Sequence, residues 1–127
     1  MSVRFNARSG PIIVPVLLWG RGGSGVLRCV LDTGSTTTLF SAAALATLGY
    51  DPSLSRDLVE VTTASNVTYA PSVAVQRIRA LDNERLDFPV LSITLPPSAN
   101  VDGLLGLDFL RGQLLLLDFR SGEITLS

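Results

Sequence analysis

Asp32 is the residue best placed to do chemistry, in the run Asp32-Thr33-Gly34-Ser35 that follows an apolar stretch ending at Leu31. A carboxylate at the exit of a buried strand lies in a low-dielectric setting and can still point into a cleft, as many catalytic carboxylates do. Gly34 allows another backbone to approach closely, and the hydroxyls of Thr33 and Ser35 can hydrogen-bond to backbone or carboxylate. Taken alone, the run is also compatible with a simple turn after a strand.

Other catalytic and metal-binding chemistry is excluded by what the chain lacks. It contains no histidine, which excludes Ser-His-Asp and Cys-His catalysis within the chain and removes the commonest zinc ligand. Its single cysteine, Cys29, lies in an apolar run and is predicted to be a buried small side chain, not a reactive thiol. We therefore expect no metal and no cofactor.

A second segment lies some seventy residues downstream, in the string Asp102-Gly103-Leu104-Leu105-Gly106-Leu107-Asp108-Phe109-Leu110. It predicts an apolar strand that ends at Gly106 and a short helix with Asp108 as its N-cap. By itself this pattern is typical of a core strand packed into a helix. Its order and spacing relative to Asp32 make it informative.

Together the two segments resemble those of the retroviral-type, single-lobe (retropepsin-like) aspartic proteases. In that family an N-terminal strand pair leads to Asp-Thr/Ser-Gly, then to a flap hairpin, more strands, a Leu-Leu-Gly type strand with a short helix, and closing strands. This chain supplies each part in that order from Ile12 to Leu126. The resemblance implies an aspartic-type endopeptidase, a hydrolase that acts on protein or peptide substrates without a cofactor.

The resemblance also implies roles for individual residues near Asp32, which would be the catalytic carboxylate. Thr33 would grip its counterpart in a partner chain, Gly34 would let the substrate backbone approach, and Ser35 would bond the outer carboxylate oxygen. The strand that passes behind this loop and supports it would consist of Leu104, Leu105 and Gly106.

The flap that closes over substrate would lie within residues 62–70. Members of the family often carry glycine at the flap tip, and here Asn66 is the nearest equivalent because it tolerates left-handed dihedrals. The residues expected to contact substrate from the flap are Thr62, Thr63, Ala64, Ser65, Asn66 and Val67.

Hydrolysis of peptides by this chemistry needs two carboxylates that share one proton. The chain has one Asp-Thr-Gly, and its other aspartates lack that context. The second carboxylate is therefore expected from a second copy of the chain, in a two-fold homodimer joined through the active-site loops. The terminal strand Glu123 to Leu126 could join a sheet shared between subunits or pair within its own chain.

Short apolar runs separated by Gly, Pro, Asn and Asp predict a mainly β fold, a small barrel or sandwich with one or two short helices. The resemblance implies that this is a small closed β-barrel or sandwich of the retropepsin-like type. We expect one domain over residues 1–127, with residues 1–10 as a loose N-terminal arm. The Gly-rich run Gly20 to Gly25 is expected to be a long hairpin loop, and Pro15 marks an edge or a bulge. The expected helix is Ser41 to Leu48; the expected strands are Ile12 to Trp19, Val26 to Leu31, Val59 to Thr63, Tyr69 to Arg79, Leu86 to Leu95, Leu114 to Phe119 and Glu123 to Leu126.

Composition and charge restrict the classes of partner that the chain is expected to bind. Hydrophobic residues make up 46% of the chain and the formal net charge is -1, so it can bury a core and has no basic footprint for nucleic acid or anionic membrane. Residues 1–10 are polar and predict no signal peptide, and no run is long enough for a membrane helix. We expect a soluble domain that is cytoplasmic by default, unless it is excised from a longer or membrane-anchored protein.

Two other interpretations stay open at this point. The fold could serve as a dimerisation or peptide-binding module with little or no turnover, although an intact Asp32-Thr33-Gly34-Ser35 argues against a decayed site. An unrelated small β domain would require both segments to match by coincidence.

Overall fold

Six strands form a closed barrel in the computed structural model, which describes residues 2–62, 65–96 and 98–127. The strands follow one another around the barrel in the order β2-β3-β8-β4-β7-β6, and pairing of β6 with β2 closes it. A further strand, β5, pairs with β6 outside the closed ring. Strands account for 51% of the chain and helix for 11%, so the expected mainly β class is confirmed.

The bounds of the elements follow the turn signals of the sequence closely. They are β1 (Val3–Arg4), β2 (Ile13–Gly20), β3 (Gly23–Leu31), β4 (Leu39–Ser41), α1 (Ala42–Thr47), the 3₁₀ helix η1 (Pro52–Leu54), β5 (Leu58–Thr62), β6 (Val67–Ala80), β7 (Asn83–Ile93), β8 (Gly103–Leu105), α2 (Leu107–Leu110), β9 (Leu115–Asp118) and β10 (Glu123–Leu126). In the described part of the chain, no helix is long and apolar enough to span a membrane.

Alternation of side chains explains how β2 and β3 build the core. Val14, Val16 and Leu18 on β2 are fully buried, and their pleat places the intervening residues on the opposite face. An edge or a bulge was expected at Pro15. β6 pairs with β2 only at residues 17–19, so Pro15 lies in the part of β2 that β6 leaves as an edge. The expected long loop at Gly20 to Gly25 is wrong: Gly20 pairs with Gly23, so the turn is tight.

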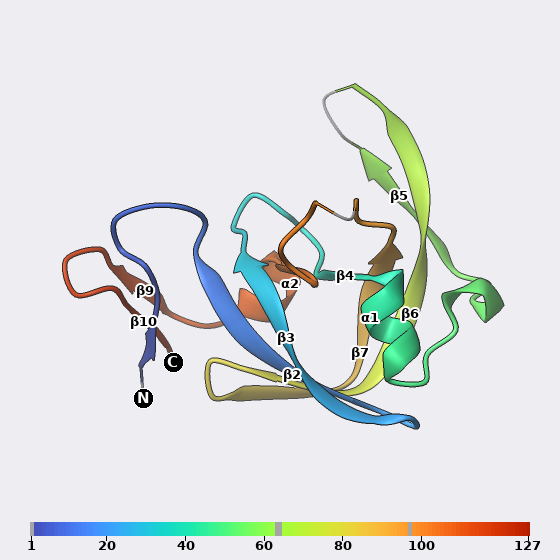
Figure 1. Ribbon diagram of the computed structural model, residues 1–127, viewed down its shortest axis with the longest axis horizontal. Coiled ribbons are helices and arrows are strands. Elements are labelled where there is room, and N and C mark those ends of the chain that lie inside the picture. The colour runs from blue at the N-terminus through green and yellow to red at the C-terminus, as the bar shows by residue number, and fades with distance from the viewer. Residues whose placement is uncertain (1, 63–64, 97) are drawn as a thin grey trace.

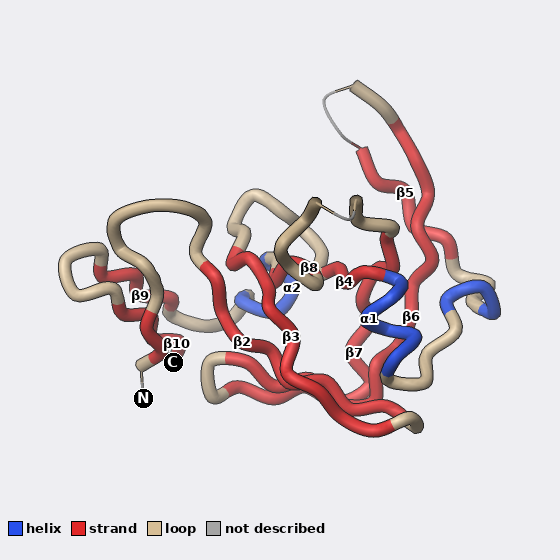
Figure 2. Tube along the Cα trace, in the orientation of Figure 1, coloured by secondary structure: helices blue, strands red, loops and turns tan. Residues whose placement is uncertain are grey.

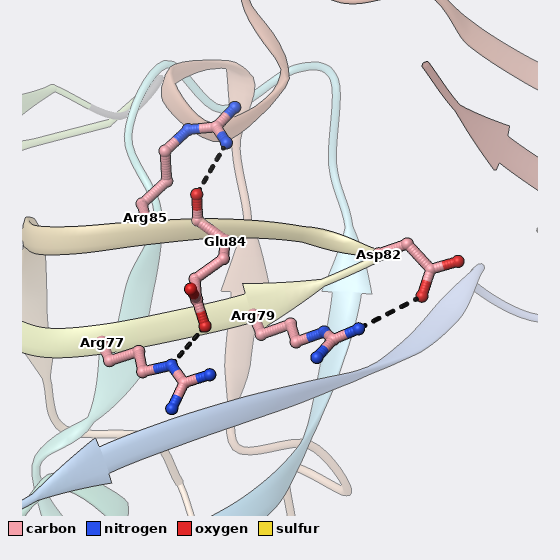
Figure 3. Close-up of polar contacts among 5 residues, drawn as sticks. All are labelled: Arg77, Arg79, Asp82, Glu84 and Arg85. Atoms are coloured by element: carbon pink, nitrogen blue, oxygen red, sulfur yellow. Dashed lines mark hydrogen bonds and ion pairs between the residues drawn. The ribbon is translucent and has the colours of Figure 1, made fainter.

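The barrel closes on the side of β2 that faces the β6–β7 hairpin. Figure 3 shows the charged side chains of that hairpin, where Arg77 forms an ion pair with Glu84 and Arg79 lies 3.7 Å from the carboxylate of Asp82. The guanidinium of Arg77 also stacks over the Trp19 ring, 4.1 Å from its centroid. The two ion pairs lie within the hairpin, and the contact between Arg77 and Trp19 joins β6 to β2.

A second sheet of three strands, the terminal sheet, has the order β1-β10-β9 and brings the two chain ends together (Figure 1). Ile124 and Leu126 are buried in the same core as the barrel strands. Part of the expected loose arm is a strand, since Val3 and Arg4 pair with β10 and the Phe5 amide donates to Gly122. The terminal strand thus pairs within its own chain on both sides.

Helix α1 begins as the sequence predicts, because the Ser41 hydroxyl accepts a hydrogen bond from the Ala44 amide at 3.0 Å. The expected N-cap of α2 is wrong: the helix is preceded by Gly106, and Asp108 lies in its first turn. As Figure 2 shows, helices are small additions to a molecule made of strands and loops.

Candidate active site

Asp32 directly follows β3, which carries it from the core to the surface. Its amide donates to the Leu105 carbonyl at 3.0 Å, so the parallel pairing of β3 with β8 continues up to this residue. The Gly34 amide donates to Asp32 Oδ1 at 2.9 Å. The half-buried carboxylate is therefore oriented by backbone on one oxygen, and no donor from the described residues occupies the other.

The next residues differ in what they contact. Thr33 is exposed at the start of the loop. The Ser35 hydroxyl donates its one proton to the Thr37 carbonyl at 2.9 Å. It therefore does not donate to the outer oxygen of the Asp32 carboxylate, which is the bond that the resemblance implied. Ser35 here stabilises the turn of the loop, and Gly34 supplies the donor to the carboxylate.

The strand β8 and the start of α2 lie directly behind this loop. The Leu107 amide donates to the Ser35 carbonyl at 2.8 Å, and the Asp108 amide donates to the Thr36 carbonyl at 3.1 Å. Gly106 lies so close that an added Cβ would stand 2.8 Å from the Ser35 carbonyl oxygen and 2.9 Å from that of Thr37. Only glycine fits this approach without moving the backbone.

A buried pair that the sequence analysis missed completes the support. Thr38 is fully buried, and both its amide and its hydroxyl donate to the Asp108 carboxylate, the hydroxyl at 2.6 Å. The Thr38 hydroxyl in turn accepts from the Gly106 amide at 3.0 Å. The sequence carried part of a signal, since an Asp just after Leu-Gly-Leu needs polar partners when it is buried, whereas nothing distinguishes Thr38 from the two threonines before it. Nothing local pairs them, because 70 residues separate them.

A cleft of about 480 Å³ opens beside Asp32. The Asp32 loop lines it, together with the apolar side chains of Leu39, Leu91 and Leu104. The residues that line it from β5 are Glu60, Val61 and Thr62. The β5–β6 hairpin projects from the barrel in Figure 1. It places residues 60–62 in the same cleft as Asp32, although they are far from it in the sequence.

The predicted flap residues are only partly brought to this cleft. Thr62, the last residue of β5, lines the cleft. Val67, the first residue of β6, pairs with Thr62 and is 52% exposed. Ser65 and Asn66 are exposed at the end of the hairpin. Thr63 and Ala64 lie outside the described residues.

The cysteine that precedes the site is inert. Cys29 is fully buried on β3, and burial, with a smaller contribution from Asp102, raises the pKa of its thiol to about 12. Among the described residues, no group of three or more His, Cys, Asp or Glu side chains could hold a metal ion. Two carboxylates of the described residues line the cleft, those of Asp32 and Glu60.

Comparisons with known proteins agree with this geometry. A family model described as aspartyl protease matches residues 15–109. Among solved structures, the fold is similar to that of a retropepsin-like aspartic protease from Rickettsia conorii, with a TM-score of 0.73 and 16% sequence identity over 99% of this chain and 89% of that one. A search of curated protein sequences gave no significant match.

Proposed function

The chain belongs to the aspartyl protease family, and from this premise we propose that it is a homodimeric endopeptidase whose active site contains two Asp32 carboxylates, one from each chain. The observation that carries the proposal is the position of Asp32. It follows a buried strand, has one oxygen oriented by the Gly34 amide, and lines a cleft together with polar and apolar side chains.

Each chain contributes one Asp32 carboxylate, and the reaction needs two such carboxylates. Two carboxylates about 3 Å apart cannot both ionise at low cost, so the pair holds one proton between them. The ionised member takes a proton from a water molecule as that water attacks the peptide carbonyl carbon. The protonated member donates to the carbonyl oxygen. Collapse of the tetrahedral intermediate then breaks the C–N bond. The amine leaves with the proton that the first carboxylate took from water, and the other carboxylate takes a proton from a hydroxyl of the intermediate, which restores the shared proton.

The residues around Asp32 would serve to position it and the substrate. The rigid support from Gly106 and Asp108 would hold two neighbouring loops at the separation that proton sharing requires. Thr33, exposed beside Asp32, is free to contact its counterpart in the second chain. The β5–β6 hairpin would act as the flap, and an extended peptide would add β-type hydrogen bonds along it.

Cleavage of an unbiased peptide library by wild type and by Asp32→Asn tests the chemistry. We expect Asp32→Asn to lower kcat/KM by at least about 10³-fold between about pH 3 and pH 7, because an amide can neither accept nor share the proton. Asp87→Asn is the matched control: Asp87 is exposed on β7 with φ of 49°, which Asn tolerates, and it does not line the cleft. Full cleavage by Asp32→Asn would contradict the mechanism.

Mixing the two proteins tests whether two chains share one site. In an equal mixture of exchanging wild-type and Asp32→Asn chains, random pairing leaves about one quarter of the dimers with two carboxylates. Activity per total chain should therefore fall to about a quarter of the wild-type value. Retention of one half would show that each chain acts alone.

The alternative function is a protease-like module that dimerises or binds peptides without turnover. The complete Asp32 loop with its full set of supporting hydrogen bonds favours the enzyme. A confirmed dimer that cleaves nothing in the library would favour the module.

A further inference from the structure

The cleft beside Asp32 has a second acidic side chain, that of Glu60. Glu60 lies on β5, where the three consecutive residues 60–62 line the cleft, so the cleft extends along this strand instead of meeting it at one point. Glu60 is exposed. Its carboxylate is therefore accessible to a peptide that binds in the cleft.

No positive charge of the described residues balances the two carboxylates. The chain has no histidine and no lysine, and no described arginine lines the cleft. The ion pairs within the described part of the chain join Arg77 to Glu84 and Arg79 to Asp82, all on or between β6 and β7. Glu60 takes part in neither of them, so the cleft has an excess of negative charge.

This excess belongs to the cleft and not to the surface as a whole. A second pocket of about 410 Å³ beside η1 also has two charged side chains, Arg21 and Asp51, and their charges are opposite in sign. The formal net charge of the whole chain is only -1. The negative charge is therefore a local property of the site that contains Asp32.

We propose that Glu60 selects substrates with an arginine or lysine side chain close to the scissile bond. This inference rests on the proposed function and names the class of peptide that the site would take. Apart from Gly34, the other residues that line the cleft carry hydroxyl or apolar side chains, among them Leu39, Leu91 and Leu104. The preferred peptide therefore combines apolar side chains with a basic one.

The physical reason for the selection is electrostatic. A positive charge within several ångströms of a carboxylate is attracted to it even without a direct hydrogen bond, and the attraction is stronger in a cleft that excludes part of the water. Arginine and lysine can place their charge beside Glu60 while their aliphatic stems contact apolar surface. A glutamate at the same position of the peptide would be repelled by Glu60 and by the ionised member of the Asp32 pair.

Two-fold symmetry extends the selection to both sides of the scissile bond. In the proposed homodimer, the rotation that relates the two Asp32 residues also relates the two Glu60 residues. An extended peptide that passes between the Asp32 carboxylates would then meet one Glu60 on each side of the bond that breaks. Basic residues should be enriched both before and after the cut, at about the same number of residues from it.

Sequencing of the products from the unbiased peptide library measures this enrichment. The position of strongest enrichment is then tested with two synthetic peptides that carry arginine or its uncharged analogue citrulline there. At about pH 6, above the ordinary range in which carboxylic acids titrate, wild type should cleave the arginine peptide with a kcat/KM about fivefold higher.

Substitutions of Glu60 test whether this carboxylate is the cause. Glu60→Gln keeps the size of the side chain and should bring the ratio close to one, mainly through a higher KM for the arginine peptide, because the attraction is similar in ground state and transition state. Glu60→Lys should bring the ratio below one. Asp87→Asn also removes one negative charge, lies outside the cleft and should keep the wild-type ratio.

Peptide binding separates recognition from cleavage. The probes are two fluorescein-labelled leucine-rich peptides that differ only in one central arginine or citrulline, and the protein is Asp32→Asn, which should not cleave them. We expect tighter binding of the arginine peptide in fluorescence anisotropy, and no difference between the peptides in Asp32→Asn/Glu60→Gln. Both proteins should unfold at the same denaturant concentration, because Glu60 is exposed and forms no ion pair with a described residue.

The outcomes distinguish this inference from the proposed function. Cleavage by wild type without a preference for arginine, or with a preference that survives Glu60→Gln, would overturn the role of Glu60 and leave the protease standing. Binding that discriminates through Glu60, in a wild-type chain that cleaves nothing, would support the selection and contradict the protease. Equal binding of the two peptides by Asp32→Asn would overturn the selection.

Discussion

The Asp32 loop (residues 32–38) and the β5–β6 hairpin face the same cleft, and they are held in different ways. The loop is bound by hydrogen bonds to residues 105–108 and by the buried Thr38–Asp108 pair. The end of the hairpin is held by the pairing of two neighbouring strands, and Leu58, Val67 and Tyr69 on it are more than half exposed. One wall of the cleft is fixed from within the core, while the other has few buried contacts, as expected of an element that opens locally at low cost.

Thiol labelling gives the largest contrast between the two regions. Cys29, on the strand that carries Asp32, is fully buried, and its thiol pKa is raised to about 12. Alkylation at neutral pH therefore requires both opening of the core and deprotonation. A cysteine placed on the hairpin by Val67→Cys, in a Cys29→Ala background, should react at least about 10³-fold faster. Labelling is followed by mass spectrometry.

The pH dependence of stability provides the control for that measurement. The folded-state pKa of Cys29 lies above its ordinary value of 9.0, so the thiol stabilises the fold below that pH, and this contribution declines as pH rises from about 9 toward 12. The difference in unfolding free energy between wild type and Cys29→Ala should be constant at neutral pH and change only in that alkaline window. Rapid labelling of Cys29 at neutral pH would contradict the comparison.

Gly106→Ala should give the largest loss of stability among single substitutions around the loop. The added Cβ would meet backbone at 2.8 Å, and neither the loop nor β8 can move without breaking hydrogen bonds. We expect a cost of about 3 kcal/mol in chemical denaturation. Gly25→Ala on β3 is the control, since its Cβ would meet only a Leu48 side chain at an ordinary 3.6 Å. Similar costs for the two would show that the close approach is not constraining.

Thr38→Val keeps the shape of the side chain and removes the hydroxyl. It would leave the Gly106 amide without its acceptor and the Asp108 carboxylate with one donor fewer, both in a buried setting. We expect a loss of about 2 kcal/mol. Thr47→Val removes a hydroxyl bond to Ala44 at the exposed end of α1 and should cost less than about 0.5 kcal/mol. A neutral Thr38→Val would show that the buried pair does not hold the loop.

Much of the fixed region could be predicted from the sequence because its signals are local and specific. The apolar run before Asp32, the turn residues after it and the Leu-Leu-Gly strand each restrict the backbone by themselves. The mainly β class followed from short apolar runs separated by turn residues, which left a barrel and a sandwich equally open. The start of α1 was also predictable, because its N-cap acts over three residues.

What sequence reasoning missed depends on contacts between distant residues. The bond between Thr38 and Asp108 joins residues 70 apart, so Asp108 was predicted as a helix cap when its carboxylate in fact binds a loop. The N-terminal strand was missed because β1 has two residues and exists only through its pairing with β10. Both errors arise where tertiary contacts override a local signal.

The smallest predicted effect concerns the β5–β6 hairpin. Val61 is half-buried on β5 and lines the cleft, so Val61→Ala removes two methyl groups from the surface that substrate would contact. At about 0.8 kcal/mol for each group, kcat/KM should fall about tenfold. The unfolding free energy should change by less than about 1 kcal/mol, because the side chain is already partly in water. Val59→Ala, two residues away on the same strand and outside the cleft, should leave kcat/KM unchanged. If Val61→Ala lowered stability more than it lowered kcat/KM, the hairpin would be packed as firmly as the Asp32 loop. The contrast between these two sides of the cleft would then not hold.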